Sequence, residues 1–151
     1  MINLRGTFIA LVFLSFCVGS LAAQRNFKFG YVKNGDGVDS VWLATTPKKN
    51  RIQGRTILSH GHTFSPRINI DGRDIKLKSV RSSLPDQNFK VGRGGYEIFR
   101  GKNVQVRLDY VFTWLCPTEQ ENCSVYYYRG VLDVTYKGKR RKVNILGFGG
   151  S

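Results

Sequence analysis

Several features that are common in enzymes are missing from this chain. Its 151 residues contain no phosphate-binding P-loop, no serine nucleophile elbow and no dinucleotide-binding glycine motif. Histidine, the side chain that most often serves as a general acid or base, occurs only as His60 and His62. These absences argue against the nucleotide-dependent and serine-hydrolase classes, and they favour a non-enzymatic protein.

Acidic side chains are scarce as well. The chain has 24 Lys and Arg against 10 Asp and Glu, which gives a net charge of +14. An excess of this size attracts anionic partners, such as an acidic glycan, a lipid headgroup, a nucleic acid or an acidic protein, although it would also serve to keep the protein soluble. We expect an anionic partner to bind at the two densest cation clusters, which are Lys48, Lys49 and Arg51, and Lys137, Lys139, Arg140, Arg141 and Lys142.

Charge is almost absent from the first 23 residues. Arg5 is the only charged side chain there, and an apolar run from Phe8 to Val18 is followed by mostly small residues that end at Ala23. This arrangement is typical of a signal peptide, whose apolar core of about 7 to 15 residues is shorter than the roughly 20 that a membrane span needs. We therefore expect cleavage after residue 23, export to the periplasm or the extracellular space, and no stable membrane anchor afterwards.

The mature protein is short. Removing residues 1–23 from the 151 leaves 128, and only Arg5 is lost among the charged residues, so the net charge falls from +14 to +13. A chain of this length is sufficient for one hydrophobic core. We expect a single domain over residues 24–151.

Cysteine is rare. Cys17 lies within the expected signal peptide, so Cys116 and Cys123 are the only thiols of the mature chain. In an oxidising compartment two such residues form a disulfide, which here would close a short polar loop and stabilise the fold by about 2 to 3 kcal/mol. The pair lacks C-x-x-C spacing and a nearby histidine, which argues against a redox or metal site. We expect no metal and no cofactor.

Long runs with helical periodicity are missing from the mature chain. Short segments that are rich in β-branched and aromatic residues alternate with polar residues and are separated by Gly, Asn, Asp and Pro, as in β-strands. The pattern predicts an antiparallel β-sandwich or small barrel of about eight strands. Before residue 100 we expect strands at 27–31, 41–46, 51–58, 67–70, 73–78 and 96–99, a tight hairpin at Asp71-Gly72, and a loop over 82–95.

The last third of the chain has the strongest alternation, and it predicts a three-strand meander formed by residues 104–115, 125–136 and 140–148. For the first hairpin we expect a register in which paired residue numbers sum to 240, because apolar side chains then face one another. This register sets Arg107 against Asp133, an attractive cross-strand pair. It also requires the disulfide to lie diagonally or beside a bulge.

The second hairpin of the meander allows two turns. A turn at Gly138-Lys139 sets Val134 opposite Val143, whereas a turn at Lys137-Gly138 sets Val134 opposite Arg141. Because apolar residues then face each other, and because a type II′ turn favours glycine first, we expect the turn at Gly138-Lys139.

The two histidines lie in the segment Ser59-His60-Gly61-His62. Among so many cations they could serve as the general acid and base of a nuclease. They could also bind a metal, but two ligands are too few unless Asp71 or Asp74 joins them. The third interpretation is a solvent-exposed turn without chemistry, which is the ordinary state of a short polar segment.

The sequence therefore predicts an exported, non-enzymatic binding protein for an anionic or polyanionic partner. One alternative is a secreted nuclease or other phosphodiester hydrolase that uses His60 and His62. Another alternative is an inhibitor, effector or immunity-type protein that recognises one protein through a fitted loop such as residues 117–122.

Overall fold

The fold is described from a computed structural model, which covers residues 26–33, 39–48, 55–61, 65–83, 90–117 and 123–150. The expected signal peptide lies outside these residues and stays a prediction. The elements are nine β-strands: β1 (Asp39–Leu43), β2 (Leu58–His60), β3 (Arg67–Ile70), β4 (Arg73–Lys76), β5 (Lys78–Ser83), β6 (Gly94–Gly101), β7 (Val104–Leu115), β8 (Val125–Tyr136) and β9 (Lys139–Gly150).

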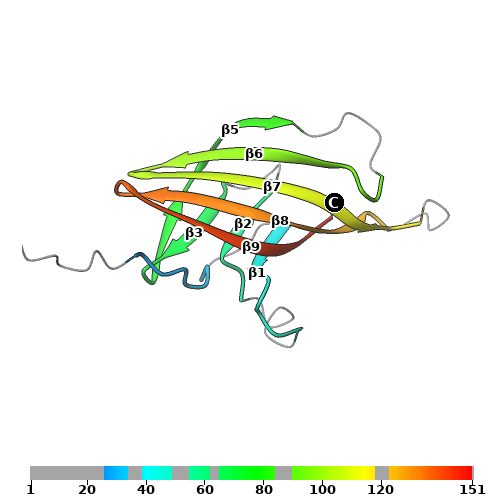
Figure 1. Cartoon of the computed structure of the whole chain (residues 1–151), viewed down its shortest axis with the longest axis horizontal. Helices are drawn as coiled ribbons and strands as arrows, with labels where there is room; N and C mark the ends of the chain where they lie inside the picture. The colour runs from blue at the N-terminus through cyan, green and yellow to red at the C-terminus, as the bar shows by residue number, and fades with distance from the viewer. Residues whose placement is uncertain are drawn as a thin grey trace, which may run out of the picture.

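All nine strands belong to one sheet, in the order β4-β3-β2-β1-β9-β8-β7-β6-β5. Neighbouring strands are antiparallel, and only the β1–β9 pair joins strands that are far apart in the sequence. Leu77 alone separates β4 from β5, the two edge strands, and its N–H donates to the Pro66 carbonyl at 2.7 Å. One bent segment thus supplies both edges, and the sheet nearly closes into a barrel (Figure 1). The all-β prediction is confirmed, in its barrel form.

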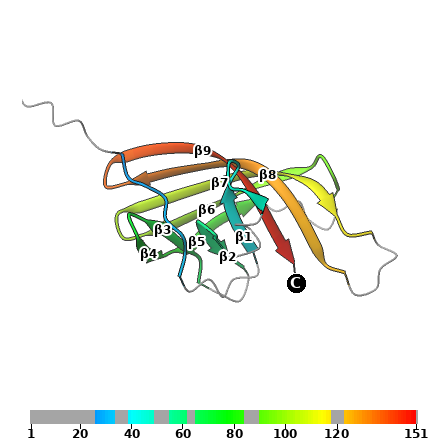
Figure 2. The same cartoon turned by 90° about the horizontal axis from the view of Figure 1, so that it is seen from below.

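The barrel has two unequal walls. Figures 1 and 2 show that the long strands β6 to β9 form a curved wall and that the short strands β1 to β4 lie across from it. Alternate side chains of the long wall point inward, because successive residues of a strand face opposite sides of the sheet. Phe99, Leu108 and Leu132 of the long wall are fully buried in one core with Leu58 and Ile68 of the short wall.

The meander of the last third is confirmed. Along most of β7 and β8 the paired residue numbers sum to 240, as for Leu108 with Leu132. A bulge between Phe112 and Trp114 shifts this register near the end of the hairpin. Just beyond it lies the disulfide between Cys116 and Cys123, whose Cα atoms are 5.8 Å apart.

The turn predicted for the second hairpin is wrong. The structure places Lys137-Gly138 in the turn, with Tyr136 opposite Lys139 and Val134 opposite Arg141. Both turn residues have positive φ, 48° at Lys137 and 77° at Gly138, the values that a type I′ turn requires. The shift by two residues leaves every side chain on its expected face. Turn geometry therefore outweighs the preference for an apolar partner opposite Val134.

Arg141 is accommodated on the inner face because its charged end leaves the core. Its guanidinium donates to the Phe27 carbonyl at 2.9 Å and lies 5.0 Å from the centre of the Phe29 ring. The long stem of an arginine can cover apolar surface while its head finds polar partners. Arg141 can therefore lie opposite Val134, where the sequence analysis expected Val143.

The first part of the chain follows its predicted strands less closely. Residues 27–31 form only one bridge, between Phe29 and Ile70, and the strand predicted for 51–58 is seen as β2 from Leu58, with 51–54 outside the described residues. The loop predicted over 82–95 is wrong at both ends, because residues 82–83 belong to β5 and residues 94–95 to β6, and 84–89 lie outside the described residues. The sequence analysis also did not separate β5 from β4. The Asp71-Gly72 hairpin is confirmed, with φ of 51° and 78°.

Candidate functional site

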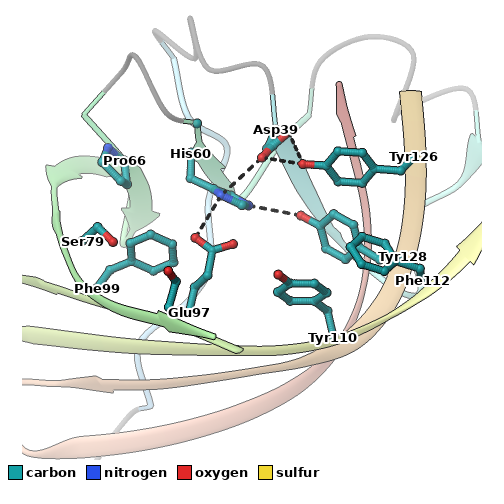
Figure 3. A pocket seen from close by; sticks show the side chains of 12 residues that line it. Asp39, His60, Pro66, Ser79, Glu97, Phe99, Tyr110, Phe112, Tyr126 and Tyr128 are labelled. Atoms are coloured by element: carbon teal, nitrogen blue, oxygen red, sulfur yellow. Dashed lines mark hydrogen bonds and ion pairs between the residues drawn. The ribbon is translucent and has the colours of Figure 1, made fainter. Parts of the chain in front are cut away.

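A polar cavity lies inside one end of the barrel. Its volume is about 240 Å³, and side chains from both walls project into it (Figure 3). The described residues that line it are Asp39, His60, Gly61, Pro66, Ser79, Ser82, Glu97, Phe99, Tyr110, Phe112, Tyr126 and Tyr128. None of them is a lysine or an arginine, so the charged side chains of this lining are two carboxylates and one histidine.

His60 is the centre of the polar cluster and is 4% exposed. Its Nδ1 atom lies 3.6 Å from the Asp39 carboxylate and 3.6 Å from the Glu97 carboxylate. Its Nε2 atom is 3.2 Å from the Tyr128 hydroxyl. Strands β1, β2, β6 and β8 thus each contribute one member of a single buried network.

Two tyrosines of β8 reach this network because β9 leaves room for them. The Tyr126 hydroxyl donates to both Asp39 oxygens, at 3.1 and 3.0 Å. A Cβ atom at Gly147 would overlap the Tyr128 ring, and one at Gly149 would overlap the Tyr126 ring. Because these two glycines have no side chain, they leave room for the aromatic rings that line the cavity.

Burial changes the acid–base behaviour of the cavity. Loss of hydration, followed by the negative charge of Asp39, raises the pKa of Glu97 to about 7 from an ordinary value of 4.5. Burial is also the main cause that raises the pKa of Tyr110, Tyr126 and Tyr128, so these hydroxyls stay protonated at neutral pH. Glu97 is thus poised to exchange a proton near neutrality.

Tyr110 differs from the other tyrosines of the cavity in its hydrogen bonding. Its side chain points into the cavity beside Glu97 and Tyr128 (Figure 3), and the residue is 6% exposed. Its hydroxyl has no hydrogen-bond partner among the described residues. A buried hydroxyl without a partner costs about 1 to 3 kcal/mol, so this hydroxyl is the polar atom of the described cavity that is available to a ligand.

The structure corrects the interpretation of the histidine segment as an exposed turn. His60 is buried in β2, and His62 lies outside the described residues. Asp71 and Asp74, the suggested additional metal ligands, instead accept hydrogen bonds from the backbone N–H groups of Lys28 and Lys33, respectively. Across the part of the chain that the structure describes, no group of three acidic, histidine or cysteine side chains is placed to hold a metal ion.

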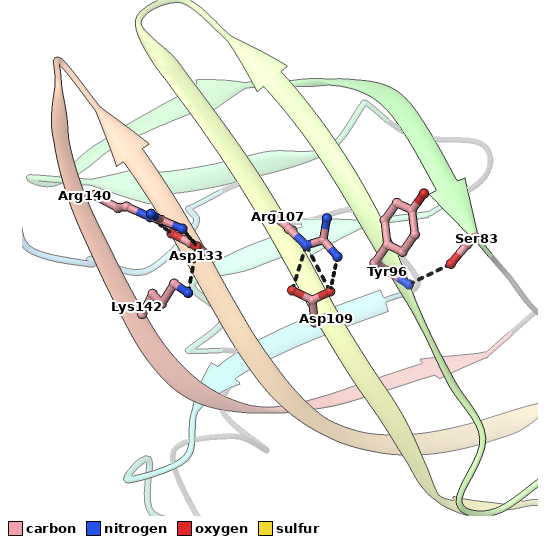
Figure 4. Close-up of polar contacts among 7 residues, drawn as sticks. All are labelled: Ser83, Tyr96, Arg107, Asp109, Asp133, Arg140 and Lys142. Atoms are coloured by element: carbon pink, nitrogen blue, oxygen red, sulfur yellow. Dashed lines mark hydrogen bonds and ion pairs between the residues drawn. The ribbon is translucent and has the colours of Figure 1, made fainter.

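The predicted cation cluster of the β8–β9 hairpin is largely engaged within the molecule. Asp133 accepts hydrogen bonds from Arg140 at 2.9 and 2.6 Å and lies 3.4 Å from Lys142 (Figure 4). Arg141 is held by Phe27, and Lys137 lies 5.2 Å from the centre of its neighbour's ring, that of Tyr136. Arg107, expected opposite Asp133, does lie there but pairs with Asp109 of its own strand.

The other predicted cluster is described only at Lys48. This exposed residue lines a groove with Trp42, Leu146 and Phe148. Lys49 and Arg51 lie outside the described residues.

A different group of cations lies where the edge strands β4 and β5 meet at Leu77. A groove of about 680 Å³ is lined by Ser65, Lys76, Leu77, Lys78, Ser79, Val80, Arg100, Gly101 and Lys102. We call it the basic groove, because all four of its charged residues are cations. None of the four takes part in the salt bridges found among the described residues.

Sequence reasoning missed both the cavity and the basic groove, and only the cavity left a signal. Glu97 lies two residues from Gly95 and from Phe99, and Asp39 lies two residues from Val41. Residues two apart share one face of a strand, so each acidic residue occupies an inward position of its strand. A carboxylate on the core face of a strand is rare and indicates a paired or functional group. The groove cations are spread over residues 76–78 and 100–102, so no dense run marks them.

Comparison with known proteins supplies no further assignment: the chain matches no family model, no curated protein and no solved structure. Within the described residues, no helix is long and apolar enough to span a membrane.

Proposed function

We propose that the mature protein is an exported, non-enzymatic binding protein for a polyanion, which it contacts through the basic groove. The observation that carries this proposal is the convergence of Lys76, Lys78, Arg100 and Lys102 in one groove whose lining residues include no acid. The hairpin cluster is the weaker candidate, because Asp133 already neutralises part of its charge.

Strand pairing brings cations face to face around this groove. Lys78 is the direct cross-strand partner of Arg100, and Lys76 is the partner of Arg67. Like charges that lie directly opposite each other destabilise a sheet, and a bound anion relieves their repulsion. Two such pairs next to each other support a partner that presents several negative charges.

The lining residues favour an acidic glycan over a single-stranded nucleic acid. Proteins that bind single strands stack bases on aromatic rings, and none of the residues that line the basic groove is aromatic. Sulfate and carboxylate groups of a glycan need only charged donors, which lysine and arginine provide.

Export is supported by the disulfide. A bridge between Cys116 and Cys123 is consistent with an oxidising compartment, since reducing cytosol keeps such pairs as thiols. The periplasm or the extracellular space remains our proposed location. The signal peptide over residues 1–23 remains part of the same proposal.

The nuclease alternative has less support. A phosphodiester substrate needs cations near its phosphate, yet the described lining around His60 offers the carboxylates of Asp39 and Glu97 and no cation besides a protonated histidine. Recognition of a single protein through residues 117–122 stays the third alternative, and residues 118–122 lie outside the described residues.

The test compares two double variants that lose the same charge. Lys78→Gln with Arg100→Gln removes two cations from the basic groove, and Arg140→Gln with Lys142→Gln removes two from the hairpin. Heparin, as an acidic glycan, is titrated into wild type and both variants at several salt concentrations. We expect the groove variant to lower the slope of log affinity against log salt by about two, one for each lost contact, and the hairpin variant to lower it less.

Two results would contradict the proposal. Heparin affinity that does not change with salt would show that charge does not drive binding. An equal or larger loss in the hairpin variant would move the site to residues 137–142. Circular dichroism of both variants checks that the fold is intact.

A further inference from the structure

We propose that the cavity inside the barrel is a binding site for a small primary ammonium ion with a short uncharged tail. This site lies inside the barrel, its ligand has the opposite charge to the polyanion, and it does not depend on the proposed function of the basic groove. Its evidence is the buried network of Asp39, His60 and Glu97 together with the Tyr110 hydroxyl, which has no hydrogen-bond partner among the residues that the structure describes.

The charge of the cluster is the first argument. Asp39 and Glu97 share a single histidine, whose Nδ1 atom lies 3.6 Å from each carboxylate. The carboxylates approach this histidine from β1 and β6, and the described lining of the cavity contains no lysine or arginine. A monovalent cation that enters the cavity would therefore meet two acidic side chains and no lysine or arginine among the described lining residues.

The hydrogen-bonding groups are the second argument. A primary ammonium has three N–H donors and no acceptor, so it needs several oxygen acceptors close together. The cavity presents the Asp39 and Glu97 carboxylates and the Tyr110 hydroxyl, which lacks a partner among the described residues. An ammonium ion would at once satisfy that hydroxyl and meet the carboxylates.

Size and surface determine the rest of the ligand. The volume of about 240 Å³ is below the roughly 300 Å³ at which pockets for drug-sized molecules begin, so the ligand has few non-hydrogen atoms. The rings of Phe99, Phe112 and Tyr126 line the same space, and they suit an apolar tail and attract a cation. Ser79 and Ser82 also line the cavity and are exposed, which gives the ligand a path from solvent.

The other ligand classes fit less well. An anion would meet two carboxylates without a lysine or arginine among the lining residues. A metal ion lacks a suitable group of three ligands among the described side chains. A neutral alcohol could satisfy Tyr110, but it offers one donor where an ammonium offers three, and it carries no charge to attract the two carboxylates.

The experiment titrates purified mature protein with n-propylammonium, and with 1-propanol as a neutral molecule of the same shape. Binding is followed by calorimetry and by the melting temperature. We expect n-propylammonium to bind and to raise the melting temperature, and 1-propanol to do neither. Propionate and choline are the probes for an anion and for a quaternary ammonium.

Three variants locate the site. Glu97→Gln and Tyr110→Phe should each weaken n-propylammonium binding by about tenfold or more, which is the effect of losing one hydrogen bond to a charged group. Asp109→Asn is the control, because Asp109 pairs with Arg107 on the outer face and should bind as wild type does (Figure 4). Tyr110→Phe should melt no lower than wild type, since it removes a buried hydroxyl that has no partner, so its loss of affinity does not reflect unfolding.

Each remaining outcome overturns the proposal. Equal effects of n-propylammonium and 1-propanol would mean that the cavity does not recognise charge and holds water in the native protein. Binding of choline or propionate in place of n-propylammonium would assign another ligand class. Unchanged affinity in both Glu97→Gln and Tyr110→Phe would place the ammonium site elsewhere. Heparin binding is measured separately and bears only on the basic groove.

Discussion

The cavity and the basic groove are two regions of one small barrel with opposite character. The cavity is lined by two carboxylates and a buried histidine, whereas the groove is lined by four cations at the surface. The chain as a whole carries a net charge of +14. The difference teaches that net charge describes what the outer surface attracts, while the sign of an interior site depends on a few residues that strand geometry turns inward.

The largest difference should be in packing, between the barrel core and the basic groove. Leu108→Ala removes a fully buried side chain of the barrel core and should lower the free energy of unfolding by about 2 to 5 kcal/mol. Val80→Ala, in the basic groove, changes a side chain that is 51% exposed and should cost less than about 0.5 kcal/mol. Urea denaturation of both variants measures the contrast, and equal losses would contradict the assigned burial.

The dependence of stability on pH tests the electrostatics of the cavity. The pKa of Glu97 is raised by burial from 4.5 to about 7, so between these values the native state holds a proton that the unfolded state has released. Stability should therefore fall as pH rises from 4.5 to 7, by at most about 3 kcal/mol, and this contribution should not change further above 7. Denaturation midpoints measured across this range test the slope.

Glu97→Gln is the control for that titration, because it cannot ionise. The groups that face Glu97 are Asp39 of β1, His60 of β2, Tyr110 of β7, and the two tyrosines of β8. The tyrosine hydroxyls stay protonated in this range, so they add nothing to the slope. An unchanged slope would mean that Glu97 does not hold the extra proton.

The glycines of β9 allow a test of how the cavity is shaped. Gly147→Ala adds a methyl group that overlaps the Tyr128 ring and should cost about 1 to 3 kcal/mol through overpacking. Gly150→Ala, on the same strand, meets nothing closer than 3.2 Å and should cost less. Thermal denaturation compares the two. A larger loss at Gly150 would show that the tyrosine rings do not need this space.

The smallest effect should come from the outer ion pairs. Arg140→Gln breaks the contact with Asp133, whose pKa is lowered mainly by the hydrogen bond from Arg140. Because this pair faces solvent, the melting temperature should fall only slightly, and the fall should shrink at high salt. A loss as large as that of Gly147→Ala, or one insensitive to salt, would place the pair in the protein's core.

Much of the fold follows from local patterns. Alternation through β7 and β8 predicted which side chains point inward as far as Phe112, and it fails at Trp114, which lies beyond the bulge and is 42% exposed. Asp71-Gly72 predicted its hairpin because both residues readily adopt positive φ. The disulfide followed from the two thiols that remain after residue 23. The strand β5 was missed because Lys78–Ser83 has a single large apolar residue, Val80, so it carries no alternation.

The candidate sites depend on distant contacts, which a local pattern cannot reveal. Asp39, His60 and Glu97 lie on three strands, and only closure of the barrel brings them together. The groove cations likewise meet because β5 pairs with β6. At Lys137-Gly138 two local rules disagreed, and the geometry of the turn outweighed the pairing of valines.

The pairing of β1 with β9 has a consequence for how the protein is made. Residues 40–43 find their partners at 145–148, near the other end of the chain. Contacts between such distant segments form slowly, since a long loop must close first. During synthesis β1 must wait for β9, so the barrel cannot close until residues 139–150 have left the ribosome. If the protein is exported as we propose, this delay would keep the chain unfolded, and so transportable, until β9 is complete.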